Sequence, residues 1–276
     1  MNVHAPPLRA DAPDSGADAP TRRGAGALGL HLLRAASALG FLALWWGLAA
    51  AASDRALPDP PAVLDALRTE LAEGALIPAL LSTLGRVAAA FALAMAAGSA
   101  LGYAMGRSRP FDAAADVWVL LLLNIPALVI ILLAYVWFGQ NEAAAIGAVA
   151  LSKLPNVVVV VREGARTLDP GLDEVARAYR FGAGARLREI VLPQMQPYLA
   201  AAARSGLAIV WKVVLVVELL GRPSGVGFEL HLRFQTFDVA GLLAYSLAFA
   251  AVMLAVEAVL MRPAERRARA WRGAAA

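Results

Sequence analysis

The sequence predicts an all-α integral membrane protein with six transmembrane helices. Two observations carry this prediction. The chain of 276 residues is 60% hydrophobic, with a mean hydropathy of +0.63, which is more apolar than soluble domains are. Six apolar runs, each of about 20 residues, also recur along the chain, and about 20 apolar residues are what a helix needs to cross a bilayer.

The composition excludes several classes of site. The chain has no cysteine, so it forms no disulfide, thiolate metal site or cysteine nucleophile. Its histidines, His4, His31 and His231, are too scattered in sequence to indicate a metal cluster. The sequence pI is near 9.8, but the arginines lie in short loops between apolar runs. This placement favours membrane topology over nucleic-acid binding, and we expect no catalytic residue and no metal site.

The first apolar run is Leu28–Ala52, after a polar stretch over residues 1–27 that reads as a disordered tail. Its uninterrupted part, Ala35–Ala52, is longer than the 7–15 residues of a signal-peptide core. We therefore expect a retained helix. The small residues Ala50–Ala52 also resemble a cleavage site, which leaves removal of this helix as the alternative.

Residues 28–77 form the first predicted region, which ends in an amphipathic segment. Asp59 is suited to cap a helix that opens with Pro60 and Pro61, and Gly74 is suited to end it. One face carries the apolar residues Val63, Leu64, Leu67 and Leu71, and the charged residues Asp65, Arg68, Glu70 and Glu73 point elsewhere. This helix lies either on the outer membrane surface or on the outer mouth of the bundle.

Five further spans follow, and an even total of six puts both termini on one side. They are Leu84–Met105, Val117–Phe138, Ala143–Val161, Leu199–Leu220 and Val239–Met261. The span Val117–Phe138, the third of the six, is interrupted by Asn124-Ile125-Pro126. Residues 263–276 form a C-terminal tail.

The arginines predict the orientation of these spans. Sixteen lie in the two tails, in the loop after the second span and in the long loop 162–198. The opposite side holds only Arg55, Arg68, Arg222 and Arg233. Because Lys and Arg are enriched in cytoplasmic loops, we expect both termini to be cytoplasmic.

The long loop 162–198 predicts two short helices that protrude from the membrane. Asp169-Pro170-Gly171 is a turn signal, after which Asp173 and Glu174 fall in the first turn of a helix, where carboxylates suit the dipole. Gly182 and Gly184 interrupt that helix, and Pro193 disturbs the end of the second. A rigid basic protrusion is suited to receive force from a partner protein.

This loop resembles the signature of the permease subunits of bacterial ABC importers. That signature reads Glu-Ala-Ala, three residues, Gly, nine residues, Ile, one residue, Leu-Pro. It falls here on Glu174, Val175, Ala176, Ile190, Leu192 and Pro193. The sequence departs from it at Arg180, which takes the glycine position, with Gly182 two residues on. This departure leaves open whether the turn between the two short helices is shifted.

The resemblance extends to the permeases of nitrate, sulfonate and taurine importers. The residues with similar spacing are Leu57–Pro60, Ser82, Arg86, Arg204, Trp211, Glu218 and Ser224–Gly227. It implies that residues 78–262 form an ABC transmembrane type-1 domain that pairs with a second copy as a homodimer. It also implies a cytoplasmic ATPase that receives the loop and a periplasmic solute-binding protein. Another solute class, such as a pyrimidine vitamin precursor, an amino acid or a phosphonate, is the alternative.

The ATPase has to be a separate chain. A phosphate-binding loop needs Gly-x-x-x-x-Gly-Lys-Ser/Thr, and neither of the two lysines, Lys153 and Lys212, follows such a pattern. We therefore expect no enzymatic activity and no cofactor in this chain, with ATP and Mg²⁺ bound by the partner ATPase in the inner membrane complex.

Ionisable groups at bilayer depth cost about 2.5–3.5 kcal/mol each, so each needs a reason. Lys153, Asn156, Lys212 and Glu218 fall inside predicted spans and are candidates for a translocation path that takes an anionic solute. The alternative is that Lys212 is neutralised by Glu218 or by another carboxylate such as Glu257. For Arg204 the simpler interpretation is that its side chain reaches the membrane interface.

Overall fold

A computed structural model describes residues 22–52 and 56–261, and these residues form helices and turns with no strand. They fall into two compact units. The first is α1 (Arg22–Ala52), of which Leu32–Ala52 is long and apolar enough to cross a membrane. Residues 22–27, expected in the N-terminal tail, are therefore helical. The rest of that tail and the C-terminal tail 263–276 lie outside the described residues.

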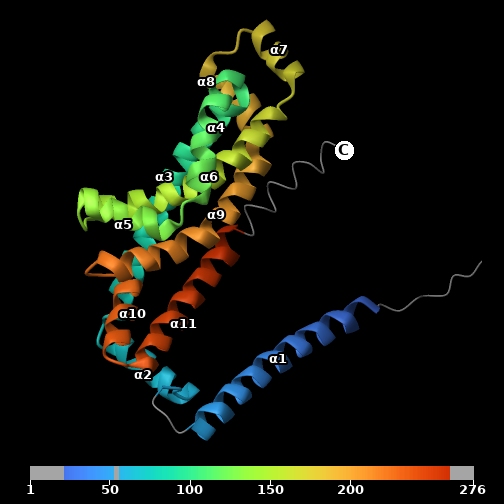
Figure 1. The fold of residues 1–276 in the computed structure, drawn as a ribbon. Coiled ribbons are helices and arrows are strands. Elements are labelled where there is room, and N and C mark those ends of the chain that lie inside the picture. The colour runs from blue at the N-terminus through green and yellow to red at the C-terminus, as the bar shows by residue number, and fades with distance from the viewer. Residues whose placement is uncertain (1–21, 53–55, 262–276) are drawn as a thin grey trace, which may run out of the picture. The chain divides into compact units, whose positions relative to one another are not determined.

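The second unit contains the remaining helices (Figure 1). These are α2 (Pro60–Ala72), α3 (Leu76–Arg107), α4 (Arg109–Asn124), α5 (Ala127–Phe138), α6 (Glu142–Arg166), α7 (Pro170–Ala178), α8 (Ala183–Arg186), the π-helical turn η1 (Leu187–Val191), α9 (Leu192–Gly221), α10 (Val226–Gln235), α11 (Val239–Val256) and the π-helical turn η2 (Glu257–Met261). Helix α10 had no counterpart in the sequence prediction.

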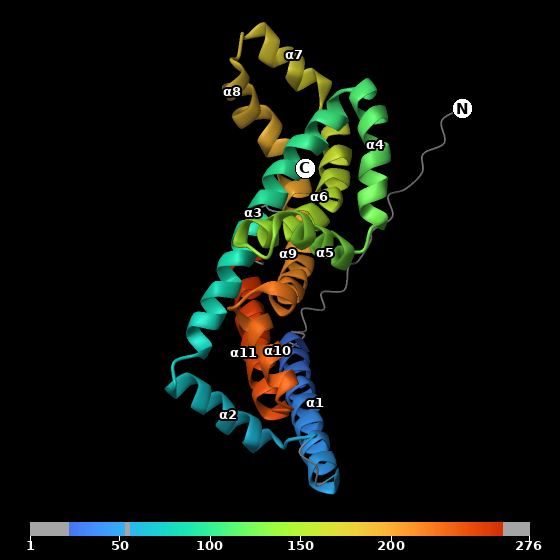
Figure 2. The same ribbon diagram turned by 60° about the vertical axis from the view of Figure 1, so that its left-hand side comes forward.

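The third expected span, Val117–Phe138, is not one straight helix. It is divided into α4 and α5, whose axes differ by 99°. The break falls at Ile125, which has an extended backbone, because a residue before proline avoids the helical region. The described residues thus contain five single helices able to span, or six spans if this bent pair counts as one. Figures 1 and 2 show α5 lying across α6.

Helices α3 and α6 form the centre of this unit, and small residues let them pack closely. Ala90, Ala94, Gly98, Gly102 and Gly106 recur every four residues along one face of α3. A Cβ added at Gly102 would lie 2.6 Å from the Val158 carbonyl oxygen of α6. Small residues at this spacing allow helix backbones to touch in membranes, so the contact leaves no room for larger side chains.

Helix α2 is packed on the bundle, not only laid on its surface. Asp59 caps it by accepting a hydrogen bond from the Ala62 N–H, and Pro60 opens it as expected. Glu70, expected to point away, is instead buried. Its carboxylate accepts a hydrogen bond from the Tyr245 hydroxyl of α11 and pairs with Arg233 of α10 at 2.6 Å. The apolar pattern of the helix did not predict this burial, because the buried face includes the charged residue Glu70, which is paired with two side chains.

Helices α8, η1 and α9 run on as one helical stretch from Ala183 to Gly221. The expectation that Pro193 ends a separate short helix was therefore wrong. Pro193 is the second residue of α9 and lies inside this continuous stretch, where a proline cannot donate the usual intrahelical hydrogen bond. The wide π-helical turn Leu187–Val191 comes directly before it.

Candidate functional site: the protruding loop and the membrane charges

The protruding loop begins with α7, whose first residue is Pro170. Asp169 caps this helix by accepting a hydrogen bond from the Gly171 N–H at 2.8 Å. Of the two carboxylates expected in its first turn, Asp173 is there and buried, whereas Glu174 follows it and is exposed. Figures 1 and 2 show α7 and α8 at the opposite end of this unit from α2 and α10.

The turn after α7 stays at the position of Arg180. This residue adopts a φ of +54°, the left-handed conformation that favours glycine. The Phe181 N–H donates to the Ala176 carbonyl and the Arg180 N–H to the Arg177 carbonyl, which is a Schellman helix end. Gly182 has an extended backbone and precedes α8. The turn is thus not shifted, and arginine occupies a conformation for which glycine is better suited.

Asp173 ties this loop to the end of α3. Its carboxylate accepts hydrogen bonds from Arg107 at 2.6 Å and, through both oxygens, from Arg186 of α8 at 3.0 and 2.8 Å. Burial by itself would raise the pKa of Asp173, but the hydrogen bonds and charges of Arg186 and Arg107 outweigh it and hold the pKa below its usual value. The sequence signature drew attention to Glu174, one residue away, and missed this anchor.

The protruding loop carries exposed apolar side chains among exposed charged ones such as Arg188 and Glu189. Its exposed large hydrophobic side chains are Leu172, Val175, Tyr179, Phe181, Leu187 and Leu192. Tyr179 is 75% exposed. Of the other signature residues, Ala176 and Ile190 are buried, and Pro193 is half-buried. Exposed apolar side chains on a loop that is otherwise polar are typical of a surface that binds a partner protein.

A second cluster of charges lies at the same end of the bundle. Arg162 of α6 pairs with Asp112 at 3.3 Å and with Asp116 at 2.5 Å, both on α4. Arg166 also pairs with Asp112 and with Glu163. Together these pairs fix the start of α4 against the end of α6.

The opposite end of α6 meets a buried polar network centred on Arg86 of α3. Its guanidinium donates five hydrogen bonds, to both oxygens of Glu142, to one oxygen of Glu218, and to the carbonyl and hydroxyl oxygens of Ser224. That number uses every N–H donor an arginine has. Glu218, a path candidate, is fully buried. Glu218 thus pairs with Arg86 and not with Lys212.

The Ser224–Gly227 stretch closes over this network. The Gly227 N–H donates to Glu218, and the Val226 N–H donates to the Thr83 hydroxyl, which itself donates to Glu218. Gly225 has a φ of +109°, and a Cβ there would collide with the Glu218 carboxylate. The glycines in this stretch are needed because backbone and carboxylate approach so closely.

Lys212 lies on an uncovered face of α9. Its side chain is exposed, and its Nζ lies 5.4 Å from the centre of the Trp211 ring. Arg204 and Ala208, eight and four residues earlier and therefore on nearby faces, are exposed as well. The structure thus places Lys212 and Arg204 along one side of the helix.

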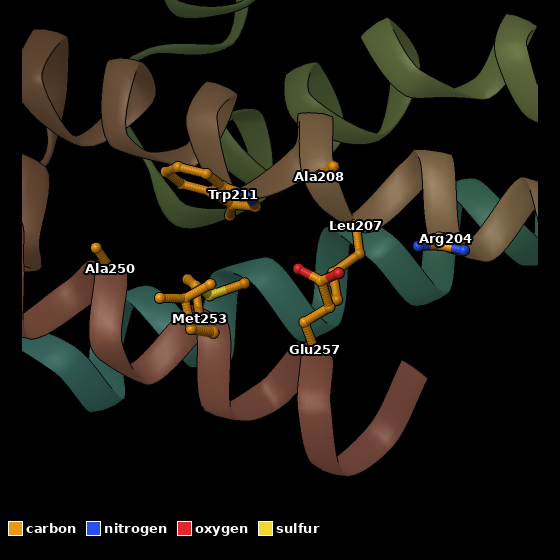
Figure 3. Close-up of a pocket in the computed structure, with 8 residues that line it drawn as sticks. Arg204, Leu207, Ala208, Trp211, Ala250, Met253 and Glu257 are labelled. Carbon is orange, nitrogen blue, oxygen red and sulfur yellow. The ribbon is translucent and has the colours of Figure 1, made fainter. Parts of the chain in front are cut away.

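A pocket of about 300 Å³ lies between α9 and α11 beside this face (Figure 3). Arg204 and Trp211 line it from α9, and Met253 and Glu257 line it from the opposite helix. In Figure 3, Glu257 lies opposite Leu207, one turn from Arg204 along α9. No ion pair between Lys212 and Glu257 is found among the described residues.

Lys153 and Asn156 occupy another place in the bundle. Lys153 lies in the middle of α6 and is 2% exposed, whereas Asn156 is half-buried. The Lys153 stem passes beside Gly206 of α9 and Phe91 of α3. The four path candidates are therefore not gathered in one site in this conformation.

Comparison with known proteins adds the family context. The model of the family described as "Binding-protein-dependent transport system inner membrane component" matches residues 94–266. SsuC of Escherichia coli, which is assigned as an aliphatic sulfonates transport permease, is 30% identical over 66% of this chain and 71% of its own. The bicarbonate transport system permease protein CmpB of Synechococcus elongatus is 28% identical over 74% of this chain and 77% of its own.

A solved structure shares the fold. The inward-facing MetNI methionine ABC transporter contains a chain that superposes with a TM-score of 0.59 at 18% identity, over 73% of this chain and 98% of that one. The described helices therefore have the fold of a type-1 ABC transporter permease.

Proposed function

The chain belongs to the family of binding-protein-dependent transport system inner-membrane components, and on that premise we propose that it forms the translocation path of an importer for small anionic solutes such as nitrate, sulfonates or taurine. It is a transport subunit of an inner-membrane ABC importer. The observation that carries the choice of solute class is the pair of cations, Lys153 and Lys212, inside membrane-spanning helices, together with relatives named for sulfonates and bicarbonate.

The protruding loop supports a separate cytoplasmic ATPase as the partner. Its exposed apolar side chains, among them Val175, Tyr179 and Phe181, lie beyond the membrane-spanning helices, where they gain by burial against another protein. Asp173 links the loop to Arg107 of α3. A displacement of α7 by the ATPase therefore acts directly on a spanning helix.

The exposed cations of α9 support pairing with a second copy. Lys212 lies nine residues before the end of α9, about 14 Å along the axis, and a charge at that depth is strongly disfavoured against acyl chains. The face that carries Lys212 and Arg204 must therefore meet water or protein. A second permease copy that covers this face and encloses an aqueous path satisfies both requirements, and a periplasmic binding protein delivers the solute to it.

The orientation follows from the arginines. The end that carries Arg107, Arg162, Arg166 and Arg186 faces the cytoplasm, so α2 and α10 face the periplasm. With the six-span scheme, both termini are then cytoplasmic.

The test is reconstitution with partners. The chain is purified with the ATPase and the binding protein encoded beside it and placed in liposomes, and uptake of labelled nitrate, methanesulfonate and taurine is measured. We expect ATP-dependent uptake of at least one of them by the complex and no ATP hydrolysis by the chain alone. Hydrolysis by the pure chain, or a complex that imports only solutes without an anionic group, would contradict the proposal.

A further inference from the structure

Lys153 is a buried lysine without a counter-charge among the residues that the structure describes. It is 2% exposed, and its Nζ has no hydrogen-bond partner among the described residues. It lies eleven residues after the start of α6 and thirteen before its end, which is about 17 and 20 Å at 1.5 Å per residue. The side chain therefore cannot reach the polar groups at either end of its helix.

The carboxylates of the spanning helices are committed elsewhere. The described spans hold seven of them, namely Asp112, Asp116, Glu142, Glu163, Glu189, Glu218 and Glu257. The first six pair with arginines. Glu257 lines the pocket between α9 and α11, whose walls do not include Lys153. None of the seven pairs with Lys153, so the described residues provide no internal neutralisation for it.

The surroundings of Lys153 are shaped to admit its side chain. A Cβ added at Gly206 of α9 would lie 3.0 Å from the Lys153 Cε and 3.3 Å from the Phe91 ring. A larger residue there would require the Lys153 stem or the Phe91 ring to move by a few tenths of an ångström, so Gly206 gives the lysine room at the α6–α9 contact. Glu218 is twelve residues further along α9, about 18 Å away along the axis. The Lys153 side chain thus lies at the contact between α6 and α9, and Glu218, the buried carboxylate of α9, is too far away to pair with it.

We propose that the Lys153 ammonium receives the negative charge of the transported solute, at a site that opens when α9 separates from α6 at Gly206. This inference rests on the proposed import of small anions and names the residue that selects them. A buried charge of this kind is expensive unless it is paired. A solute anion that enters during the transport cycle provides the missing partner, and it is released when the helices close again.

Uptake by the reconstituted complex tests the assignment, with methanesulfonate, taurine and nitrate as probes. Lys153→Met should reduce anion uptake and solute-stimulated ATP hydrolysis at least tenfold, with a melting temperature equal to or above that of the wild type, because an unpaired charge is removed. Lys153→Arg should keep part of the uptake. Arg68→Met, which removes an exposed cation from α2, is the matched control and should transport normally.

The outcomes separate this inference from the proposed function. If the wild type imports an anion and Lys153→Met imports it equally well, the assignment of Lys153 is wrong while the function stands. A lower melting temperature for Lys153→Met would mean a structural pair and would also overturn it. If the wild-type complex imports none of the anions but does import another solute, the anion function itself fails, and Lys153 loses its role with it.

Labelling of a single thiol tests the opening directly. Because the chain has no cysteine, Lys153→Cys introduces its only thiol. In the resting complex a water-soluble maleimide should not react with it, and in the complex trapped with ATP and vanadate it should. A thiol that reacts equally in both states, or in neither, would contradict the opening at Gly206.

Discussion

The Arg86 guanidinium and the Glu218 carboxylate lie 2.7 Å apart, although 132 residues separate them in the chain. Both side chains are buried. A buried charge that loses its partner is left uncompensated, so the ends of α3, α6 and α9 depend on this contact.

Removal of one partner should destabilise the fold strongly. We expect Glu218→Gln to lower the free energy of unfolding by about 3–5 kcal/mol, since it leaves Arg86 short of a buried counter-charge. Thermal unfolding in detergent measures the effect. Combination with Arg86→Met should recover part of the loss, because the two sites are coupled. Glu189→Gln, an exposed carboxylate at 3.8 Å from Arg188, is the control and should change stability by less than about 0.5 kcal/mol.

Two glycines of α3 should respond in opposite directions to alanine. At Gly102 a Cβ would lie 2.6 Å from a backbone oxygen of α6, so Gly102→Ala should push the helices apart and lower stability by about 1–3 kcal/mol. At Gly85 a Cβ meets nothing within 4 Å. Gly85→Ala should instead raise stability by up to about 1 kcal/mol through helix propensity. Equal effects of the two changes on the melting temperature would argue against close packing at Gly102.

The turn after α7 should be improved by glycine. Arg180 has a φ of +54°, which costs a non-glycine residue about 1–2 kcal/mol. Arg180→Gly should therefore slow proteolysis within residues 170–186 in the purified complex. Gly182→Ala, at an extended position with free space, is the control and should leave the cleavage rate unchanged. Faster cleavage of Arg180→Gly would mean that the arginine side chain itself stabilises the turn.

The link between the loop and α3 should depend on the charge of Asp173. Because the pKa of Asp173 is lowered in the folded chain, its stabilising contribution is complete above the ordinary aspartate pKa of about 3.9 and is lost only as the pH falls through the lower folded-state value. Protease sensitivity of the loop should therefore be the same at pH 7 and pH 5. Asp173→Asn should raise it at both values, whereas Glu174→Gln should not. A rise in the wild type between pH 7 and pH 5 would contradict this assignment.

Labelling in intact cells should resolve the orientation. The chain offers no native thiol. Gln235 ends α10 and Glu189 follows α8, and both are exposed; α10 and α8 lie at opposite ends of the second unit (Figure 1). An impermeant maleimide should react with Gln235→Cys and should react with Glu189→Cys only after the cells are broken. The reverse pattern would invert the proposed topology.

The sequence predicted the membrane-spanning segments well, because a run of about twenty apolar residues can be recognised without any knowledge of tertiary contacts. It also placed α7, since Asp169 and Pro170 are a local cap and helix start. It missed the 99° bend between α4 and α5, although the interruption at Pro126 was visible, because the angle depends on how α5 packs across α6. It missed α10 as well, since ten amphipathic residues resemble a loop.

The partners of the charges were harder to predict. Glu218 and Lys212 are six residues apart in one predicted span, and both were candidates for the translocation path because they are ionisable groups at bilayer depth. In the structure Glu218 binds Arg86, far away in sequence, and Lys212 faces outward. Likewise, the regular spacing of Gly98, Gly102 and Gly106 is visible in the sequence, but only the contact with α6 shows why these positions have no room for a side chain.

The contact between α3 and α6 has a consequence for how the bundle can change shape. Where two backbones touch, no side-chain rotation can absorb a displacement, so Gly98, Gly102 and Gly106 make the two helices behave mechanically as a single strut. One end of this strut carries Arg107, bound to the loop, and the other carries Arg86, bound to α9 through Glu218. A displacement of α3 at Arg107 would therefore also move Arg86, some 30 Å away at 1.5 Å per residue, and with it the contact to the Ser224–Gly227 stretch.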